Sequence, residues 1–393
     1  MSSQQNTKAI MLPVVMISLA LALRQMSMTI VAPFISTYCR SLTGYTPLLA
    51  GIAVGAFGLM QAVLQIPFGV FSDKYGNKRV LLSGLVIVII GLIVGFFAKS
   101  IWMLILARVL QGSGAIIGVG YSWAAGLAAD DQSRTKAMSI LGAFISAAAA
   151  LAFAVGPLLR DIMPVNWMFL AGAILLTLNS LYILFFLKEA GGGGNSIPQR
   201  GEIAALLRNR SFVLMNLAAF LNNFMMMSVF FAAPIYMDQV TGQNGLWKFF
   251  VPAIIIAILF MKPCARWAGK GHVNLVLLVA FAVSFLSILF YFRSSSFVFL
   301  LLGTVLFLCG YVTIATVAAT HVNEVVDDSL RGTGNGIFNS FQYIGNFGGA
   351  LVTGAVWGSS QPAAWLIVIA AGISGFLLIA FGGKTRRKEA DER

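Results

Sequence analysis

Charge is scarce in this sequence, and acidic charge is scarcest. Only 10% of the 393 residues are charged, and 13 Asp and Glu residues stand against 26 Lys and Arg, for a net charge of +13. An average soluble domain has about 25% charged residues. Because 59% of the chain is hydrophobic, a water-soluble domain is excluded, and a lipid bilayer is the expected surrounding and partner of the chain.

Clusters of reactive side chains are missing as well. The three cysteines, Cys39, Cys264 and Cys309, show neither pairing nor metal spacing, and no nucleophile triad or cluster of His, Asp and Glu stands within or beside the apolar runs. We therefore expect no enzyme, no cofactor and no metal site. The cations lie in short loops between apolar runs and not on one basic domain, which argues against a nucleic-acid partner.

Long apolar runs, in contrast, are abundant. A spanning helix needs about 20 apolar residues, and lipid permits only helices or a closed barrel, whose alternating pattern these unbroken runs lack. We predict an all-α membrane protein with twelve transmembrane helices, at 10–38, 47–71, 80–98, 101–125, 137–160, 164–187, 211–237, 247–267, 273–292, 297–320, 332–358 and 362–382.

A Gly-rich, charged stretch divides these helices into two sets of six. Such a stretch is flexible and solvated, so it can join two bundles without fixing their angle. The predicted domains are a six-helix bundle at 1–187, a cytoplasmic linker at 188–210, a second six-helix bundle at 211–383 and a basic cytoplasmic tail at 384–393.

The positions of the lysines and arginines predict the orientation. With both termini cytoplasmic, nineteen of the 26 lie at inner helix ends, five lie at outer ends, and two, Arg24 and Arg108, lie inside spans. Cytoplasmic loops carry the excess of positive charge in multi-pass proteins. We therefore expect an even number of helices with both ends inside.

The turn between the second and third predicted spans combines glycines, one acid and several cations, namely Gly69, Asp73, Lys74, Gly76, Lys78 and Arg79. The glycines permit close helix approach and a tight turn, and Asp73 follows a helix end. This spacing resembles motif A of the major facilitator superfamily. The resemblance implies a gating role, in which Asp73 latches the two halves on the cytoplasmic side, with Arg134 as a plausible partner.

Two further segments resemble motifs of the same family. The fourth predicted span carries the motif B pattern in Arg108, Gln111 and Gly112. An Arg at membrane depth costs roughly 3 kcal/mol on insertion scales, so Arg108 should face a polar partner or a cavity, and we favour a structural role. The fifth span ends in Gly156 and Pro157, which are similar to motif C of antiporters in this Gly-Pro pair alone; helix packing and an antiporter role both remain open.

The resemblance covers nearly all spans and is strongest in the first half. It is closest to the YajR-like branch of drug:proton antiporters, without the soluble C-terminal domain that members of that branch can carry. It implies the major facilitator fold, with a central site between two six-helix repeats. In the second repeat, the segment that corresponds to motif A runs from Cys264 to His272 and keeps glycines and cations but lacks the acid.

The two cations inside the predicted spans have no acid beside them at that depth. A central cavity would then be electropositive and favour an anionic or electronegative substrate. Arg24 is the main candidate for contacting it; the alternative is a structural Arg hydrogen-bonded to carbonyls or amides. Because Arg stays charged, coupling protons would need other carriers. These are the substrate itself or Asp73, Asp238, His321 and Glu324 at the span boundaries.

The eleventh predicted span carries a polar stripe. Asn339, Gln342, Tyr343 and Asn346 recur at i, i+3, i+4 and i+7 and so share one helix face. We predict that this face lines the cavity; the alternative is binding to a neighbouring helix through amides. The same argument adds further candidate substrate-binding residues, namely Gln61 and Gln65 in the second span and Asn222 and Asn223 in the seventh.

These patterns together predict a secondary active transporter that moves a small molecule by alternating access. Export or antiport of amphipathic or anionic compounds is favoured, and an organic-anion exchanger and a lipid or glycolipid flippase are the alternatives. A non-transporting membrane sensor is the candidate from another class. We expect a monomer in the cytoplasmic (inner) membrane of a bacterium.

Overall fold

The computed structural model describes residues 2–127, 131–189, 200–242, 245–293, 295–327 and 330–382. Within these ranges the chain is almost entirely helical and forms no strand beyond one isolated bridge between Thr43 and Ser100. The all-α prediction is therefore confirmed.

The chain packs as two compact units. Unit 1 comprises Met1–Phe34, Leu42–Gly44 and Leu59–Gln199, and unit 2 comprises Ile35–Ser41, Tyr45–Gly58 and Arg200–Arg393. The division of the chain at 188–210 stays a prediction, since this range also contains a helix, α9 (Arg200–Arg208), whose Leu206 is buried in the core of unit 2.

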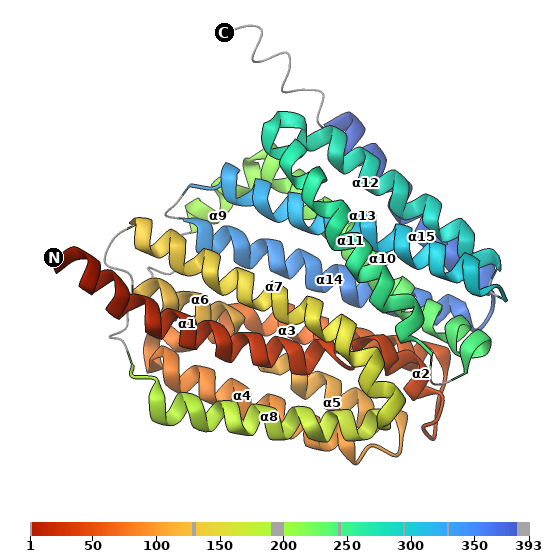
Figure 1. Ribbon diagram of the computed structural model, residues 1–393, viewed down its shortest axis with the longest axis horizontal. Helices are drawn as coiled ribbons and strands as arrows, with labels where there is room; N and C mark the ends of the chain where they lie inside the picture. The colour runs from red at the N-terminus through yellow and green to blue at the C-terminus, as the bar shows by residue number, and fades with distance from the viewer. Residues whose placement is uncertain are drawn as a thin grey trace, which may run out of the picture. The chain divides into compact units, whose positions relative to one another are not determined.

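Unit 1 holds the helices that carry motifs A and B. They are α1 (Ser2–Thr29), the 3-10 turn η1 (Ala32–Phe34), the second half of α3 (Pro47–Tyr75), α4 (Asn77–Phe96), α5 (Ile101–Ser113), α6 (Ile117–Gly126), α7 (Asp131–Ile162) and α8 (Val165–Phe186). Figure 1 shows α1 beside α7, and α4 beside α5 and α8.

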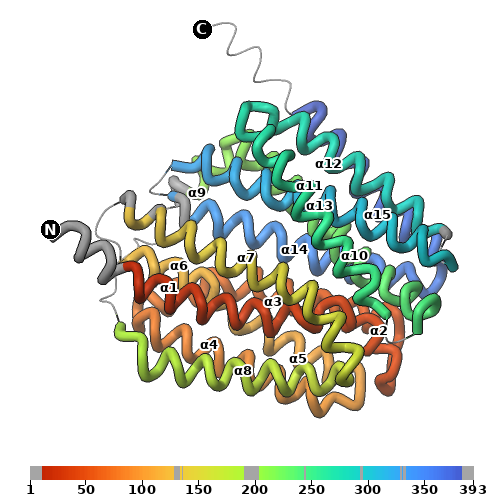
Figure 2. Tube along the Cα trace, viewed as in Figure 1, coloured from red at the N-terminus to blue at the C-terminus, as the bar shows by residue number. Residues whose placement is uncertain are grey.

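Unit 2 holds the remaining helices. They are α2 (Ile35–Cys39), the first half of α3, α9, α10 (Arg210–Thr241), α11 (Trp247–Trp267), the π-helical turn η2 (Ala268–His272), α12 (Val273–Ser287), η3 (Ile288–Arg293), α13 (Phe297–Val325), α14 (Arg331–Trp357) and α15 (Gln361–Gly382). In this unit α10 packs along α14, and α11 and α12 both pack on α13 (Figure 2).

Glycines set the close contacts of α14. A Cβ at Gly345 would lie 2.3 Å from the carbonyl oxygen of Phe220 in α10, and one at Gly51 in α3 would lie 2.4 Å from that of Ala350. Small residues let helix backbones approach closely in lipid, where association depends on packing rather than on a hydrophobic driving force. The glycines therefore fix α14 between α10 and the first half of α3.

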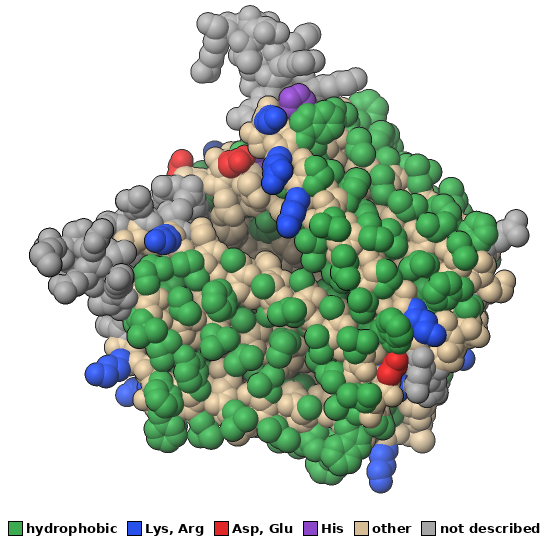
Figure 3. Space-filling model, in the orientation of Figure 1, with side chains coloured by type: hydrophobic (Ala, Val, Ile, Leu, Met, Phe, Trp, Pro, Cys, Tyr) green, Lys and Arg blue, Asp and Glu red, His purple; other side chains and the backbone are tan. Residues whose placement is uncertain are grey.

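The helices reproduce the predicted spans. Ten stretches of the described chain are long and apolar enough to cross a membrane, and one of them, Trp247–Phe292, holds two predicted spans, α11 and α12. The twelfth span is α14, which falls outside the ten because of its glycines and its polar stripe. Large apolar side chains such as Ile66 and Phe185 are about three-quarters exposed, as expected where the neighbour is lipid. Figure 3 shows hydrophobic side chains spread over the helices on the face in view.

Two predicted spans are interrupted, which corrects the expectation of continuous helices at 10–38 and 101–125. The first breaks after Thr29, and the turn that follows contains Pro33, which has no amide hydrogen to donate. The fourth breaks at 114–116, between α5 and α6, next to the glycines of motif B. The second of these breaks builds the candidate site.

Candidate substrate-binding site

Arg24 is the centre of a buried polar cluster in unit 1. Its side chain, in α1, is fully buried. Its Nη2 donates to Oε1 of Gln61 at 2.7 Å and to the carbonyl oxygen of Gly114 at 3.0 Å. Gln61 lies in α3 and Gly114 lies in the break between α5 and α6. Three segments that are distant in the sequence thus meet at one guanidinium group.

At the break, α4 passes very close to Gly114. A Cβ there would lie 2.3 Å from Cγ2 of Val88 and 2.5 Å from the carbonyl oxygen of Gly84, both in α4. Gly114 has φ −79° and ψ 64°, outside the helical region, so its carbonyl leaves the regular helix ladder. Interrupted helices at membrane depth expose backbone oxygens that bind ions and substrates in many transporters.

The cluster leaves polar atoms unused. Nε2 of Gln61 and Oε1 of Gln65 are buried and have no hydrogen-bond partner among the described residues. Since these residues are four apart in α3, they share one face of the helix. A buried, unpaired polar atom costs about 1 to 3 kcal/mol. Such atoms indicate a place where a ligand would complete the hydrogen bonding.

The other buried cation, Arg108, serves as a helix tie. Its Nη1 donates to Oε1 of Gln111 at 2.7 Å, and Nε2 of Gln111 donates to the carbonyl oxygen of Gly91 in α4 at 3.2 Å. Gly112, next in the chain, is buried as well. The motif B residues therefore join α5 to α4.

In unit 2 the polar stripe of α14 is half-buried. Asn339 and Gln342 make no hydrogen bond with any described residue, and Oδ1 of Asn346 is buried without a partner. Tyr343 meets the ring of Phe57 edge-on, with 6.4 Å between the ring centroids. This face thus retains hydrogen-bonding capacity that neighbouring helices do not use.

The two asparagines of α10 are placed differently. Nδ2 of Asn222 donates to the carbonyl oxygen of Tyr311 in α13 at 3.2 Å, and Nδ2 of Asn223 donates to that of Ala219 at 2.9 Å. Both side chains are buried. The donor of Asn222 thus binds a neighbouring helix, which was the alternative considered for such amides, whereas the donor of Asn223 bonds within α10 itself.

The motif A turn is tied to the end of α8. Gly76, at φ 90°, makes the turn between α3 and α4. Nζ of Lys78 donates to the carbonyl oxygens of Leu184 and Leu187 at 2.8 and 2.6 Å, and the backbone amide of Lys78 donates to the carboxylate of Glu189 at 3.2 Å. The ammonium group of Lys78 thus satisfies carbonyl groups at the end of α8, and the carboxylate of Glu189 satisfies an amide at the start of α4.

Asp73 takes no part in the hydrogen bonds between the motif A turn and the end of α8. It lies in the last turn of α3, which runs on to Tyr75, and not after the helix end as expected. Within the described part of unit 1 it makes no hydrogen bond or ion pair, and Arg134 does not pair with it. The remaining cations, Lys74 and Arg79, are exposed. A Cβ at Gly69 would meet nothing within 4 Å, so close helix approach does not explain this glycine here.

The motif C-like pair has a packing reason. A Cβ at Gly156 in α7 would lie 2.6 Å from the carbonyl oxygen of Ile30, at the break after α1. Pro157 beside it is buried. The glycine therefore lets α7 approach α1 where α1 loses its helical form.

Two polar groups were not identified correctly from the sequence. Glu189 was assigned only to the predicted linker. His321 was considered only as a proton carrier at a span boundary, and its partners were not predicted: its Nε2 lies 3.0 Å from Oγ of Ser211 and its Nδ1 lies 3.2 Å from Oε2 of Glu324. The spacing of His321 and Glu324, three apart on one helix, was a usable signal for the second contact.

Two compact helical units, twelve spans and a buried Arg at a broken helix define a multi-pass membrane transporter. The chain belongs to the Major Facilitator Superfamily, whose family pattern matches residues 17–350. This family consists of transporters and not of enzymes.

Named relatives agree with this assignment. The chain is 28% identical over 338 residues to the inner membrane transport protein YajR of Escherichia coli (strain K12), covering 84% of this chain and 74% of that protein. It is 26% identical over 248 residues to the multidrug resistance protein MdtH of Yersinia enterocolitica, covering 61% and 60%.

Solved structures share the fold. The crystal structure of a bacterial homolog to the human lysosomal transporter Spinster, in an inward-facing and occupied conformation, has a TM-score of 0.74 at 15% identity and covers 96% of this chain and 97% of that one. The human organic anion transporter MFSD10 has a TM-score of 0.69 at 18% identity, covering 96% and 100%.

Proposed function

We propose that the protein is a secondary active transporter that exports amphipathic or anionic small molecules by alternating access across the inner membrane of a bacterium. The observation that carries this proposal is the Arg24 cluster. A buried cation at a helix break, beside amide atoms without partners, is suited to an electronegative ligand group. The name of the relative MdtH, a multidrug resistance protein, supports the choice of amphipathic compounds.

Exchange of organic anions is the second candidate. The same positive charge favours it, because the spans carry two buried arginines and the sequence places no acid at their depth. The half-buried stripe of α14, with free hydrogen-bonding capacity, would contribute neutral polar contacts in either case. If protons are coupled, His321 and Glu324 are the connected pair of titratable groups at a span end.

The test compares ligand stabilisation of the purified wild type and Arg24→Ala. A ligand at a hundredfold excess over its dissociation constant stabilises the folded state by about 2.7 kcal/mol. We expect anionic amphiphiles to raise the melting temperature of the wild type and to lose this effect in Arg24→Ala. The assay is thermal unfolding in detergent against matched anionic, cationic and neutral amphiphiles.

Arg108→Ala is the matched control, since Arg108 is also a buried Arg that bonds a glutamine. It should keep the response to anions even if its unliganded melting temperature falls. Stabilisation by cationic amphiphiles in both the wild type and Arg24→Ala would overturn the anion site and favour a cationic-drug exporter.

A further inference from the structure

Helix α11 has an interfacial anchor at each end. At its start, Nζ of Lys248 lies 6.0 Å from the ring centroid of Trp247, and at its end Trp267, which is 48% exposed, is followed by Lys270. Its 21 residues correspond to about 32 Å of helix, close to the thickness of the hydrocarbon core. Tryptophan and lysine gather where lipid headgroups begin. The last turn of α11 therefore lies at the headgroup level of the membrane.

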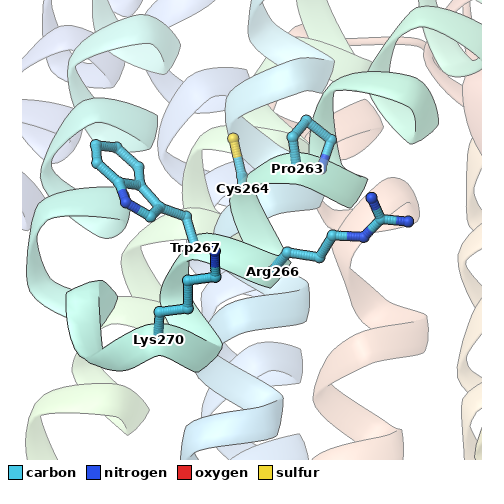
Figure 4. Close-up of a pocket in the computed structure, with 5 residues that line it drawn as sticks. All are labelled: Pro263, Cys264, Arg266, Trp267 and Lys270. Carbon is cyan, nitrogen blue, oxygen red and sulfur yellow. The ribbon is translucent and has the colours of Figure 1, made fainter.

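A pocket of about 340 Å³ opens at this level. It is lined by Pro263, Cys264, Arg266, Trp267 and Lys270 (Figure 4). The π-helical turn η2 continues α11 at this point, and a Cβ at Gly269 or Gly271 would meet nothing within 4 Å, so the pocket mouth is open. Basic side chains gather over this end of α11 and α12 in Figure 3.

The cations of the pocket form no ion pair with an acid in the described part of the chain. Arg266 and Lys270 are exposed, with Lys262 one turn earlier, and none of the three forms an ion pair with a described residue. In the motif A turn of unit 1, by contrast, the carboxylate of Glu189 lies beside Lys78. The segment from Cys264 to His272 itself contains no acid, so its cations are available to an anion from outside the protein.

An apolar slot adjoins the charged pocket. A smaller cavity of about 30 Å³ shares Cys264 and Trp267 with it and is lined further by Phe260, Val276, Val279, Ala280 and Thr313. Phe260 and Val279 are exposed, and they lie on the bilayer side of Trp267 along α11 and α12. A ligand here would meet cations at one end and a hydrocarbon surface at the other.

We propose that this pocket binds one anionic phospholipid, with the phosphate at Arg266 and Lys270 and an acyl chain along the slot. The lipid is a bound partner and not the transported substrate. Charge complementarity selects the anionic headgroup, since a Lys or Arg near a membrane surface contributes about 1 kcal/mol to binding anionic lipid. The shared apolar wall selects a lipid over a free phosphate.

The first test measures binding of phosphatidylglycerol and phosphatidylcholine to the detergent-purified protein by native mass spectrometry. We expect the wild type to prefer phosphatidylglycerol, and the double variant Arg266→Gln/Lys270→Gln to weaken this binding about thirtyfold. Arg40→Gln/Lys99→Gln, which also removes one Arg and one Lys from exposed sites elsewhere, should bind like the wild type. Equal loss in both variants, or no preference between the lipids, would overturn the proposal.

The second test uses the unmutated protein, so it decides the matter even if the variants fail to fold. Cys264 lines both cavities, whereas Cys39 and Cys309 are buried. Long-chain phosphatidylglycerol should slow maleimide labelling of Cys264 at least fivefold, and soluble glycerol phosphate should not. Unchanged labelling would refute lipid binding here, and equal protection by glycerol phosphate would reduce the pocket to a simple anion site.

Discussion

The carboxylate of Glu189 caps the start of α4, which lies more than a hundred residues earlier in the sequence. Helix α4 starts after Gly76, which has no side chain to accept from the first free amides. Glu189 accepts from the amide of Lys78 in its place, while Nζ of Lys78 bonds the last carbonyls of α8. The start of α4 is thus capped by Glu189, which follows α8, and the end of α8 is capped by Lys78 of α4.

Glu189→Gln is expected to lower the stability of unit 1 by about 0.3 to 1 kcal/mol, because it removes negative charge from the positive end of α4. The measurement is the thermal unfolding midpoint in detergent at low salt. Asp73→Asn is the matched control, since Asp73 is an exposed acid without a partner in unit 1. If both variants lowered the midpoint equally, the capping role would be wrong.

Individual residues were predictable where polarity alone marks them. Arg24 and Gln61 stand out as polar residues inside apolar spans, but their contact joins positions 37 apart and depends on how α1 and α3 pack. Glu189 lies in a charged stretch where one more acid carries no signal. The sequence therefore indicates which residues belong to the site more readily than which atoms they bind.

At the scale of elements, the break between α5 and α6 matters most. The hydropathy of the sequence predicts one continuous span there, because side-chain polarity carries no information on the backbone conformation at 114–116. Gly114, where the helix breaks, lies in a close tertiary contact with α4. Span ends, in contrast, follow from where charges begin, and α11 matches its predicted bounds of 247–267.

Gly114→Ala should destabilise the protein by about 1 to 3 kcal/mol, because its methyl group would overlap Val88 and the backbone of Gly84. It should also impair ligand binding by displacing the carbonyl that bonds Arg24. Thermal unfolding and the ligand-stabilisation assay measure the two effects.

Gly118→Ala provides the comparison, since its added methyl would make only an ordinary contact with Gln65 at 3.8 Å. Its stability and ligand response should stay near those of the wild type. Equal tolerance of both substitutions would show that the break does not depend on this contact.

At the scale of the whole molecule, transport requires two alternating states. The motif A resemblance assigns Asp73 to a latch between the halves, and the side chain is exposed and unpaired within the described part of unit 1. Asp73 lies in the last turn of α3, so the latch would need the N-terminus of another helix, where an acid gains about 0.3 to 1 kcal/mol, enough to bias a nearly balanced equilibrium. This latch remains a proposal.

Asp73→Asn is expected to slow transport in liposomes at least severalfold while expression and melting temperature stay unchanged, because the acid acts in switching and not in folding. Glu189→Gln should show the opposite pattern, with a lower melting temperature and smaller transport loss. Normal transport rates for Asp73→Asn would refute the latch.

The all-α membrane fold and its spans could be predicted because lipid imposes length and polarity on every helix. The substrate could not, since a ligand is selected by a few atoms whose positions depend on packing. Arg24 illustrates both limits: its depth follows from the sequence, whereas its bond to a backbone carbonyl required the structure.

The polar stripe and glycines of α14 bear on how the protein is made. Helix α14 does not reach the hydropathy of the other spans in the described chain, so the insertion machinery meets a weak signal when it is synthesised. Its packing partners α3 and α10 are both translated earlier and offer the backbone contacts of Gly51 and Phe220. Retention of α14 in the bilayer should therefore depend on helices already inserted, which makes the order of synthesis part of the assembly of unit 2.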